Sequence, residues 1–301
     1  MRNMWRVAMA VALLWGMTVM AGDTTRAVSP SVAEIKAAAA KLVPLCQKMG
    51  KPQLGDWLVS HPESGQTFDE YLALRPRRVT DVYTTLYVQP LGDFSKTQEK
   101  LIDDTAEFLG IFYGVPVKKL KALPKSAVPE TARRKHPKWG DEQILTGFVE
   151  DLLRKDRPKD AMAVIALTTS DLYPGEGWNF VFGEASLVGR VGVWSMYRFG
   201  DPEKEYTTVL QRTLKVASHE TGHMLGIAHC TAYECGMNGS NSMPEADRQP
   251  MAFCRECDAK VWYACKSDIA GRYKKLAAWA GEHKLEAEAK FWREAESAVK
   301  K

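Results

Sequence analysis

The chain has 301 residues, about twice the length of a typical domain, so one or two globular units are expected. Apolar residues make up 45% and charged residues 26%, an ordinary balance for a soluble protein with a large core, which excludes wholesale disorder and a protein of many membrane spans. The net charge of +4 is too small and too dispersed to indicate a nucleic-acid partner, and we expect none.

The first segment has the features of a secretory signal. Arg2 and Arg6 precede an apolar run, Val7–Ala21, that is shorter than the roughly 20 residues needed to span a bilayer and ends in a small-x-small cleavage pattern. We therefore expect residues 1–21 to be removed on export to the periplasm or the medium, and the mature chain to have no stable membrane anchor. The alternative is an uncleaved membrane anchor.

The predicted elements along the chain alternate between helix and strand. Ser31 and Glu34 have the spacing of a capping box, so a helix is predicted from there to about Leu42. Further helices are predicted over residues 68–74, 97–109, 205–225 and within 269–299, and strands over residues 82–88, 115–120, 161–167, 179–182 and 191–197. This alternation predicts an α/β or α+β fold with a mixed sheet.

Three of the six histidines fall within eleven residues, His219 to His229. On a helix, His219 and His223 lie on one face about a turn apart, so both imidazoles can bind one Zn²⁺ ion. Gly226 allows the chain to leave the helix by a turn, after which His229 can supply a third ligand. Three protein ligands leave one position for water, which is typical of a catalytic site. Glu220 is not needed as a ligand and can act as general base. The alternative, a helix with chance surface histidines, is disfavoured by Gly226 and His229 at this spacing.

Four of the six cysteines form two closely spaced pairs: Cys230, Cys235, Cys254 and Cys257. This spacing is the pattern of a four-thiolate structural zinc site. The alternative is one or two disulfides, which an exported location favours. Cys46 and Cys265 lie outside the pattern, either as buried thiols or as partners of each other.

The run from His219 to Met237 resembles the archaemetzincins, whose motif is His-Glu-x-x-His-x-x-Gly, three residues, Cys, four residues, Cys-x-Met, about seventeen residues and Cys-x-x-Cys. The match is position for position up to Met237, and the spacer at residues 238–253 is sixteen residues long. Gly55–Leu58 and Gly65–Phe68 also resemble segments of the animal members. The resemblance therefore spans about residues 50–265.

The resemblance implies a metzincin-like catalytic domain with a mixed, mostly parallel sheet and a long active-site helix. It implies a catalytic zinc on the three histidines with Glu220 as base, a structural zinc on the four cysteines, and Met237 as the methionine turn beneath the metal. Two Zn²⁺ ions per chain are therefore expected. It also implies an edge strand that pairs with an extended peptide. The candidates for that strand are Phe180, Val181, Phe182 and Gly183. By composition alone, this segment is equally a core strand.

We expect the catalytic domain at residues 79–265, a helical or irregular segment at 22–78 before it, and a helical extension at 266–301. The favoured function is a monomeric zinc metallopeptidase that hydrolyses a peptide or protein substrate through a zinc-activated water, with Glu220 as base. The alternative is a metal- or peptide-binding protein of the same fold with negligible turnover, which has no need for a base at Glu220. The family is mostly cytosolic, so the signal segment departs from it and bears on the redox state of the cysteines.

Overall fold

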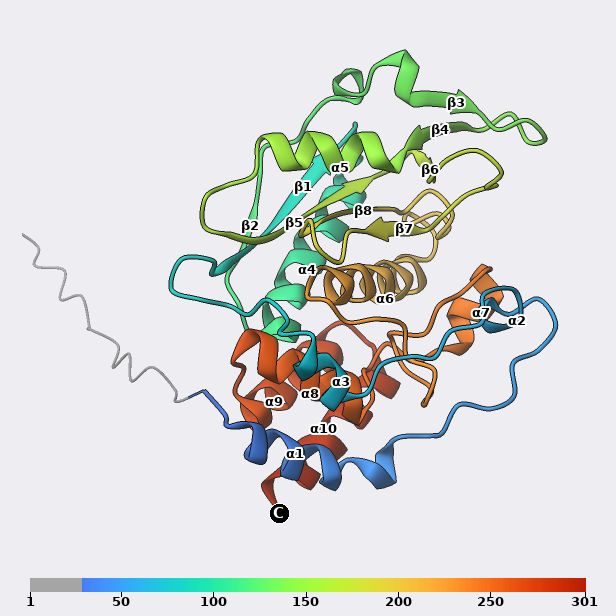
Figure 1. The fold of residues 1–301 in the computed structure, drawn as a ribbon. Helices are drawn as coiled ribbons and strands as arrows, with labels where there is room; N and C mark the ends of the chain where they lie inside the picture. The colour runs from blue at the N-terminus through green and yellow to red at the C-terminus, as the bar shows by residue number, and fades with distance from the viewer. Residues whose placement is uncertain (1–28) are drawn as a thin grey trace, which may run out of the picture.

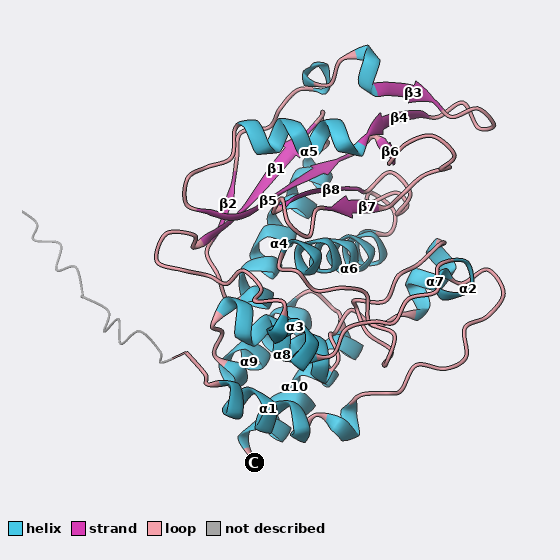
Figure 2. Ribbon diagram, viewed as in Figure 1, coloured by secondary structure: helices cyan, strands magenta, loops and turns pink. Residues whose placement is uncertain are grey.

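The computed structural model describes residues 29–301, so the expected signal segment lies outside the described part of the chain. The described residues form a sheet with helices on both faces, and a further helical layer beyond one of these faces (Figure 1 and Figure 2). Within them the larger sheet has the strand order β2-β1-β5-β8-β7, parallel throughout except for β7 against β8. Its strands are β1 (Thr85–Leu91), β2 (Val117–Lys119), β5 (Ala161–Thr168), β7 (Gly183–Ala185) and β8 (Val191–Ser195).

A smaller sheet, β3-β4-β6, lies beside the larger one, and its strand β6 comes directly after β5 in the chain. Its strands are β3 (Arg133–Lys135), β4 (Glu142–Leu145) and β6 (Asp171–Tyr173). β3 and β4 are antiparallel, whereas β4 and β6 are parallel.

The central strands are covered on both faces, which explains their composition. Every residue of β1, β5 and β8 is buried, as expected of parallel strands between two helical layers. Helix α5 (Thr146–Lys155) packs on one face, and α4 (Lys96–Tyr113) and α6 (Tyr206–Met224) pack on the other (Figure 1). This sandwich holds α6, the helix that carries the histidine motif, directly beneath the sheet.

The layer beyond α4 and α6 is formed by both ends of the described chain. It contains α1 (Val32–Lys41), α8 (Arg255–Cys265), α9 (Ile269–Glu282) and α10 (Glu286–Lys300). The expected capping box of Ser31 and Glu34 starts α1. The C-terminal tail divides into α9 and α10 around Lys284, which has a left-handed backbone with φ of +59°. No helix in residues 29–301 is both long and apolar enough to cross a bilayer.

Short helices complete the described chain. They are α2 (Trp57–Ser60), α3 (Phe68–Ala73), α7 (Met243–Arg248) and three 3₁₀ turns at Val43–Leu45, Lys125–Ala127 and Glu130–Ala132. Helices α2 and α7 lie next to each other (Figure 1), and α7 is bonded to α6 through Arg212 and Lys215.

The expected fold class is confirmed, but some boundaries differ. The strand expected over residues 179–182 begins only at Gly183. The reason is that Val181 pairs with Leu172 of the smaller sheet, so the chain joins β8 only after it has left β6. The strand expected at 82–88 is shifted to Thr85–Leu91, where it pairs with β5. The remaining strands, β3, β4 and β6, have three or four residues each, too few to show a periodic pattern.

We predict that Phe108→Ala destabilises the fold by about 3–5 kcal/mol, because it empties a fully buried site where α4 meets the C-terminal helices. The Phe108 ring centroid lies 5.3 Å from that of Trp279 on α9 and 6.1 Å from that of Trp292 on α10. Urea unfolding followed by circular dichroism measures the loss. Leu54→Ala, at a side chain that is 98% exposed, is the control and should change stability by less than about 0.5 kcal/mol. Equal stability of the two variants would contradict this role.

Candidate metal centres

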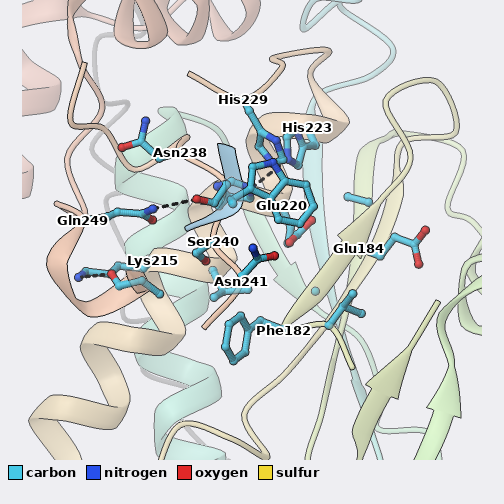
Figure 3. A pocket seen from close by; sticks show the side chains of 18 of the residues that line it. Phe182, Glu184, Lys215, Glu220, His223, His229, Asn238, Ser240, Asn241 and Gln249 are labelled. Carbon is cyan, nitrogen blue, oxygen red and sulfur yellow. Dashed lines mark hydrogen bonds between the residues drawn. The ribbon is translucent and has the colours of Figure 1, made fainter. Parts of the chain in front are cut away.

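Helix α6 and the turn after it present the histidine motif. The helix ends in a Schellman motif, in which the Ile227 amide donates to the Gly222 carbonyl at 3.1 Å and the Gly226 amide donates to the His223 carbonyl at 2.8 Å. Gly226 has a φ of +83°, a left-handed conformation that favours glycine. The turn reverses the chain so that His229 lies next to the last turn of the helix, as Figure 3 shows for His223 and His229.

The Nε2 atoms of the three histidines point toward one another, because each Nδ1 atom lies within hydrogen-bond distance of an oxygen on the other side of its ring. Nδ1 of His219 lies 3.0 Å from the Gly236 carbonyl oxygen, and Nδ1 of His223 lies 2.7 Å from the Ile227 carbonyl oxygen. One nitrogen from each of these rings and from His229 lies within 4.8 Å of the others. The structure thus brings together all three histidines of the motif.

The protonation of these rings fits a metal ion. A carbonyl oxygen can only accept, so Nδ1 of His219 and of His223 must be the N–H and Nε2 must carry the lone pair. Burial, and then the neighbouring histidines, hold the pKa of His219 well below its usual range, and the same causes lower the pKa of His223 to about 4. Their two Nε2 atoms therefore face each other as lone pairs, 2.9 Å apart. A cation that accepts both lone pairs removes this repulsion, and neutral imidazoles are the ligands that Zn²⁺ prefers.

Glu220 is buried between α6 and the edge strand β7. Burial is the main cause that raises the pKa of Glu220 to about 8, and the Glu184 and Glu150 carboxylates add to it. The carboxylate packs directly on Gly183, where a Cβ atom would lie 2.6 Å from its Oε1. A Cβ atom at position 183 would therefore force the Glu220 carboxylate to move.

A cleft of about 320 Å³ runs along this site (Figure 3). β7 forms one wall, α6 the floor, and the chain after Met237 the opposite wall. The Phe182 carbonyl accepts from the Ser195 amide and the Ser186 amide donates to Val191, so these alternate residues pair with β8. Gly183 and Ala185 consequently direct their backbone groups toward the open edge. Of the candidates Phe180, Val181, Phe182 and Gly183, only Gly183 lies within the strand itself.

Met237, the residue that the resemblance implies as the methionine turn, packs against Gly222 of α6. It is fully buried, and a Cβ atom at Gly222 would lie 2.6 Å from its sulfur. The preceding residue, Gly236, supplies the carbonyl that holds His219. The loop of Gly236 and Met237, the methionine loop, therefore supports His219 as well as the floor of the site.

The four cysteines of the expected second site come together in a buried cluster. Their sulfur atoms all lie within 4.8 Å of one another, and Sγ of Cys230 lies 3.7 Å from Sγ of Cys254. Four sulfurs placed tetrahedrally about 2.3 Å from a zinc ion would be about 3.8 Å apart, whereas a disulfide needs about 2.05 Å. Hydrogen bonds from the other three thiols lower the pKa of Cys230. The spacing fits a shared metal ion and not a disulfide.

All six cysteines lie in the described residues, and none is in a disulfide. Burial raises the pKa of the Cys46 thiol to about 11 and that of the Cys265 thiol to about 12. Both are therefore protonated, unreactive thiols at neutral pH, and neither belongs to the four-cysteine cluster.

Several residues of the site carry no motif, and the sequence analysis missed them. Asn238 accepts from the Cys235 amide at 2.8 Å and donates to the Cys230 carbonyl at 2.7 Å, which closes the loop between the two centres. Glu63 contacts His229, and Gln66 contacts the turn after α6. Glu63 lies beside, and Gln66 within, the segment Gly65–Phe68, which was singled out only for its resemblance to the family. Neither residue belongs to a metal-binding or catalytic motif that could have predicted its role.

The comparisons with known proteins agree with this geometry. A family model described as Peptidase family M54 matches residues 117–262. Archaemetzincin-2 of Rattus norvegicus is 33% identical over 259 residues, which are 74% of this chain and 72% of that protein, and the Homo sapiens protein of the same name is 33% identical over 258 residues, 74% of this chain and 71% of that protein. The chain belongs to the archaemetzincin family.

The fold comparison points the same way. The crystal structure of archaemetzincin from Methanopyrus kandleri is 32% identical, with a TM-score of 0.50, and the likeness covers 60% of this chain and 94% of that one. The expected family is thus confirmed, and with it the class of enzyme. The chain is a zinc metallopeptidase, a hydrolase with peptide substrates.

We predict that Gly183→Ala lowers kcat/KM by roughly 10- to 100-fold, because the added Cβ would lie 2.6 Å from Oε1 of Glu220 and must displace the carboxylate. Hydrolysis of a quenched fluorescent peptide library measures the effect. Gly147→Ala is the matched control, since a Cβ in that helix meets nothing within 4 Å and should leave activity intact. Full activity of Gly183→Ala would show that the contact with Gly183 does not position Glu220.

Proposed function

We propose that His219, His223 and His229 hold the catalytic zinc and that Glu220 is the general base for peptide hydrolysis. The observation that carries this proposal is that the Nε2 atoms of His219 and His223 lie 2.9 Å apart while both Nδ1 atoms lie within hydrogen-bond distance of carbonyl oxygens. This geometry implies two Nε2 lone pairs that face each other. When bound there, zinc acts as a Lewis acid that polarises the substrate carbonyl and lowers the pKa of water.

The edge of the sheet binds the substrate in this proposal. An extended peptide that runs antiparallel to β7 can pair with the outward backbone groups of Gly183 and Ala185. Such pairing is independent of side-chain identity and brings a peptide carbonyl into the cleft between β7 and α6. The remaining wall residues of the cleft then contact the substrate side chains.

Glu220 moves the proton. Its carboxylate takes a proton from the water that attacks the peptide carbonyl and transfers it to the amine nitrogen as the C–N bond breaks. A carboxylate whose pKa is raised by burial binds this proton readily, and a dication nearby favours the ionised form that starts the cycle. Burial against Gly183 keeps bulk water away from the carboxylate.

We predict that Glu220→Gln lowers kcat by about 10²–10⁴-fold while zinc remains bound, since the amide cannot accept the proton but the three ligands are unchanged. His223→Ala should instead lose the metal. Peptide hydrolysis and elemental analysis of the same samples separate the two effects. Glu99→Gln, at an exposed position on α4, is the control for the loss of a carboxylate elsewhere. Near-normal activity of Glu220→Gln would refute its role as base.

We further propose that Cys230, Cys235, Cys254 and Cys257 hold a second, structural zinc, for a total of two per chain. The spacing of their sulfurs supports this proposal over disulfides. The amides of Met237 and Cys254 donate to Sγ of Cys235 at 3.4 Å and 3.2 Å, and such bonds stabilise a thiolate.

The proposal of export rests on residues 1–21 alone, which lie outside the described chain. A zinc-loaded cluster is consistent with an exported protein because bound thiolates are protected from oxidation by the metal and by burial. We propose that the mature chain works as a monomer.

We predict that the chain binds about two zinc ions. We also predict that Cys254→Ser loses one of these ions together with much of the activity. The coupling follows because Cys230 adjoins His229 and its amide donates to the Met237 carbonyl at 2.8 Å. Elemental analysis with a thiol count measures it, and Cys46→Ser, outside the cluster, should keep both ions. One zinc and no free thiols among the four cysteines would contradict the structural site.

A further inference from the structure

Residues 57–67 run along the turn that carries the third histidine, although they lie outside the residues matched by the family model. We propose that Glu63 is a positioning residue for His229, and that Gln66 holds the turn on which His229 stands. The inference rests on the proposed zinc site and extends it by a segment far away in the sequence.

His229 differs from the other two histidines in how its ring is held. His219 and His223 bond to main-chain carbonyls of the motif region itself. His229 stands beyond the end of α6, and its Nδ1 instead lies 3.0 Å and 2.9 Å from the two carboxylate oxygens of Glu63, 166 residues away. A carboxylate accepts a hydrogen bond from Nδ1–H, which leaves Nε2 free on the side of the other rings.

Glu63 is itself held in place by an aromatic side chain. Nε1 of Trp57 donates to its Oε1 at 2.9 Å, and the Trp57 ring meets the His229 ring edge-on, with centroids 5.3 Å apart. Trp57 in turn packs on Gly239 of the opposite cleft wall, where a Cβ atom would lie 2.5 Å from its ring. The carboxylate is thus fixed relative to both His229 and the cleft.

Gln66 closes the turn from the same segment. Its side-chain amide donates to the Gly226 carbonyl at 3.3 Å, and its side-chain oxygen accepts from the Ala228 amide at 3.2 Å. The fully buried Lys260 amino group donates to the Gln66 carbonyl. Thr231, two residues after His229, donates to the Ser64 carbonyl at 3.3 Å. The segment therefore bonds to the turn on both sides of His229.

This arrangement has a direct consequence for metal binding. A ligand on a loop must be ordered when the metal binds, and the bonds from residues 63–66 supply that order beforehand. The loss of an outer partner of a metal-bound histidine typically weakens metal binding by about 10–100-fold. The zinc affinity of the histidine site should thus depend on Glu63 although Glu63 does not bind zinc.

The test compares Glu63→Ala and Glu63→Gln with the wild-type full chain, and uses zinc alone as the probe. Chelator competition before and after thiol modification separates zinc on the histidines from zinc on the cysteines. We expect Glu63→Ala to raise the Kd of the histidine site by about 10–100-fold and Glu63→Gln, which keeps a neutral acceptor, to raise it less. The cysteine site should be unchanged. Asp69→Asn, an exposed carboxylate paired with Lys36, is the control and should stay within about twofold of wild type.

A second measurement distinguishes positioning from simple stability. In metal-free wild type, ¹⁵N NMR of the imidazoles should show His229 with its proton on Nδ1, and Glu63→Gln, which preserves the shape of the side chain, should lower that population. An unchanged Kd and tautomer in Glu63→Gln would overturn the inference even if the melting temperature fell. Absence of zinc from the histidines of the wild type would instead overturn the proposed function, and this inference with it.

Discussion

The hydrogen bonds on the far side of each imidazole ring determine where the rest of the site can lie. A hydrogen bond to one nitrogen of a histidine fixes the tautomer and the direction in which the other nitrogen can face a metal. Here the three holders come from three places: Gly236 in the methionine loop, Ile227 in the turn after α6, and Glu63 near the N-terminal end of the described chain. The helix positions two rings on one face, but each ring acquires its rotation from a separate segment.

The loop that carries Cys230 and Cys235 also helps to orient the histidines, because it is bonded to the residues that hold them. Cys230 follows the third histidine directly, and its amide donates to the carbonyl of Met237, the residue after the carbonyl that holds His219. Asn238 bonds to both Cys230 and Cys235, so the loop between the centres has little freedom. Hydrogen bonds of this loop thus connect the sulfur cluster to both His229 and His219.

Close backbone approach determines the position of the base. The edge strand comes near enough to α6 that Gly183 leaves space for Glu220, and α6 comes near enough to the methionine loop that Gly222 leaves space for Met237. Both approaches need a rigid sheet above and a rigid helical layer below. The aromatic cluster of Phe108, Trp279 and Trp292 ties α4 to that lower layer, beside α6. The remote core is in this sense part of the active-site geometry.

Local rules accounted for much of what the amino-acid sequence alone determined. The spacing of His219 and His223, the turn at Gly226 and the capping box at Ser31 each depend on a few neighbouring residues, so the helices that carry them were predictable, as was the α/β class with a mixed sheet. That the sheet is mostly parallel was implied only by the resemblance to a known family.

Tertiary structure decided what depends on distant partners. Gly183 begins the edge strand because Val181 is already paired with the smaller sheet, and three-residue strands carry no period from which their ends could be inferred. Glu63 and Gln66 belong to no chemical motif, and their role arises only because folding brings them against a turn about 160 residues further along the chain. A ligand set can be predicted from spacing because a helix has a fixed repeat, whereas the groups that orient those ligands are chosen by packing, which no local pattern records.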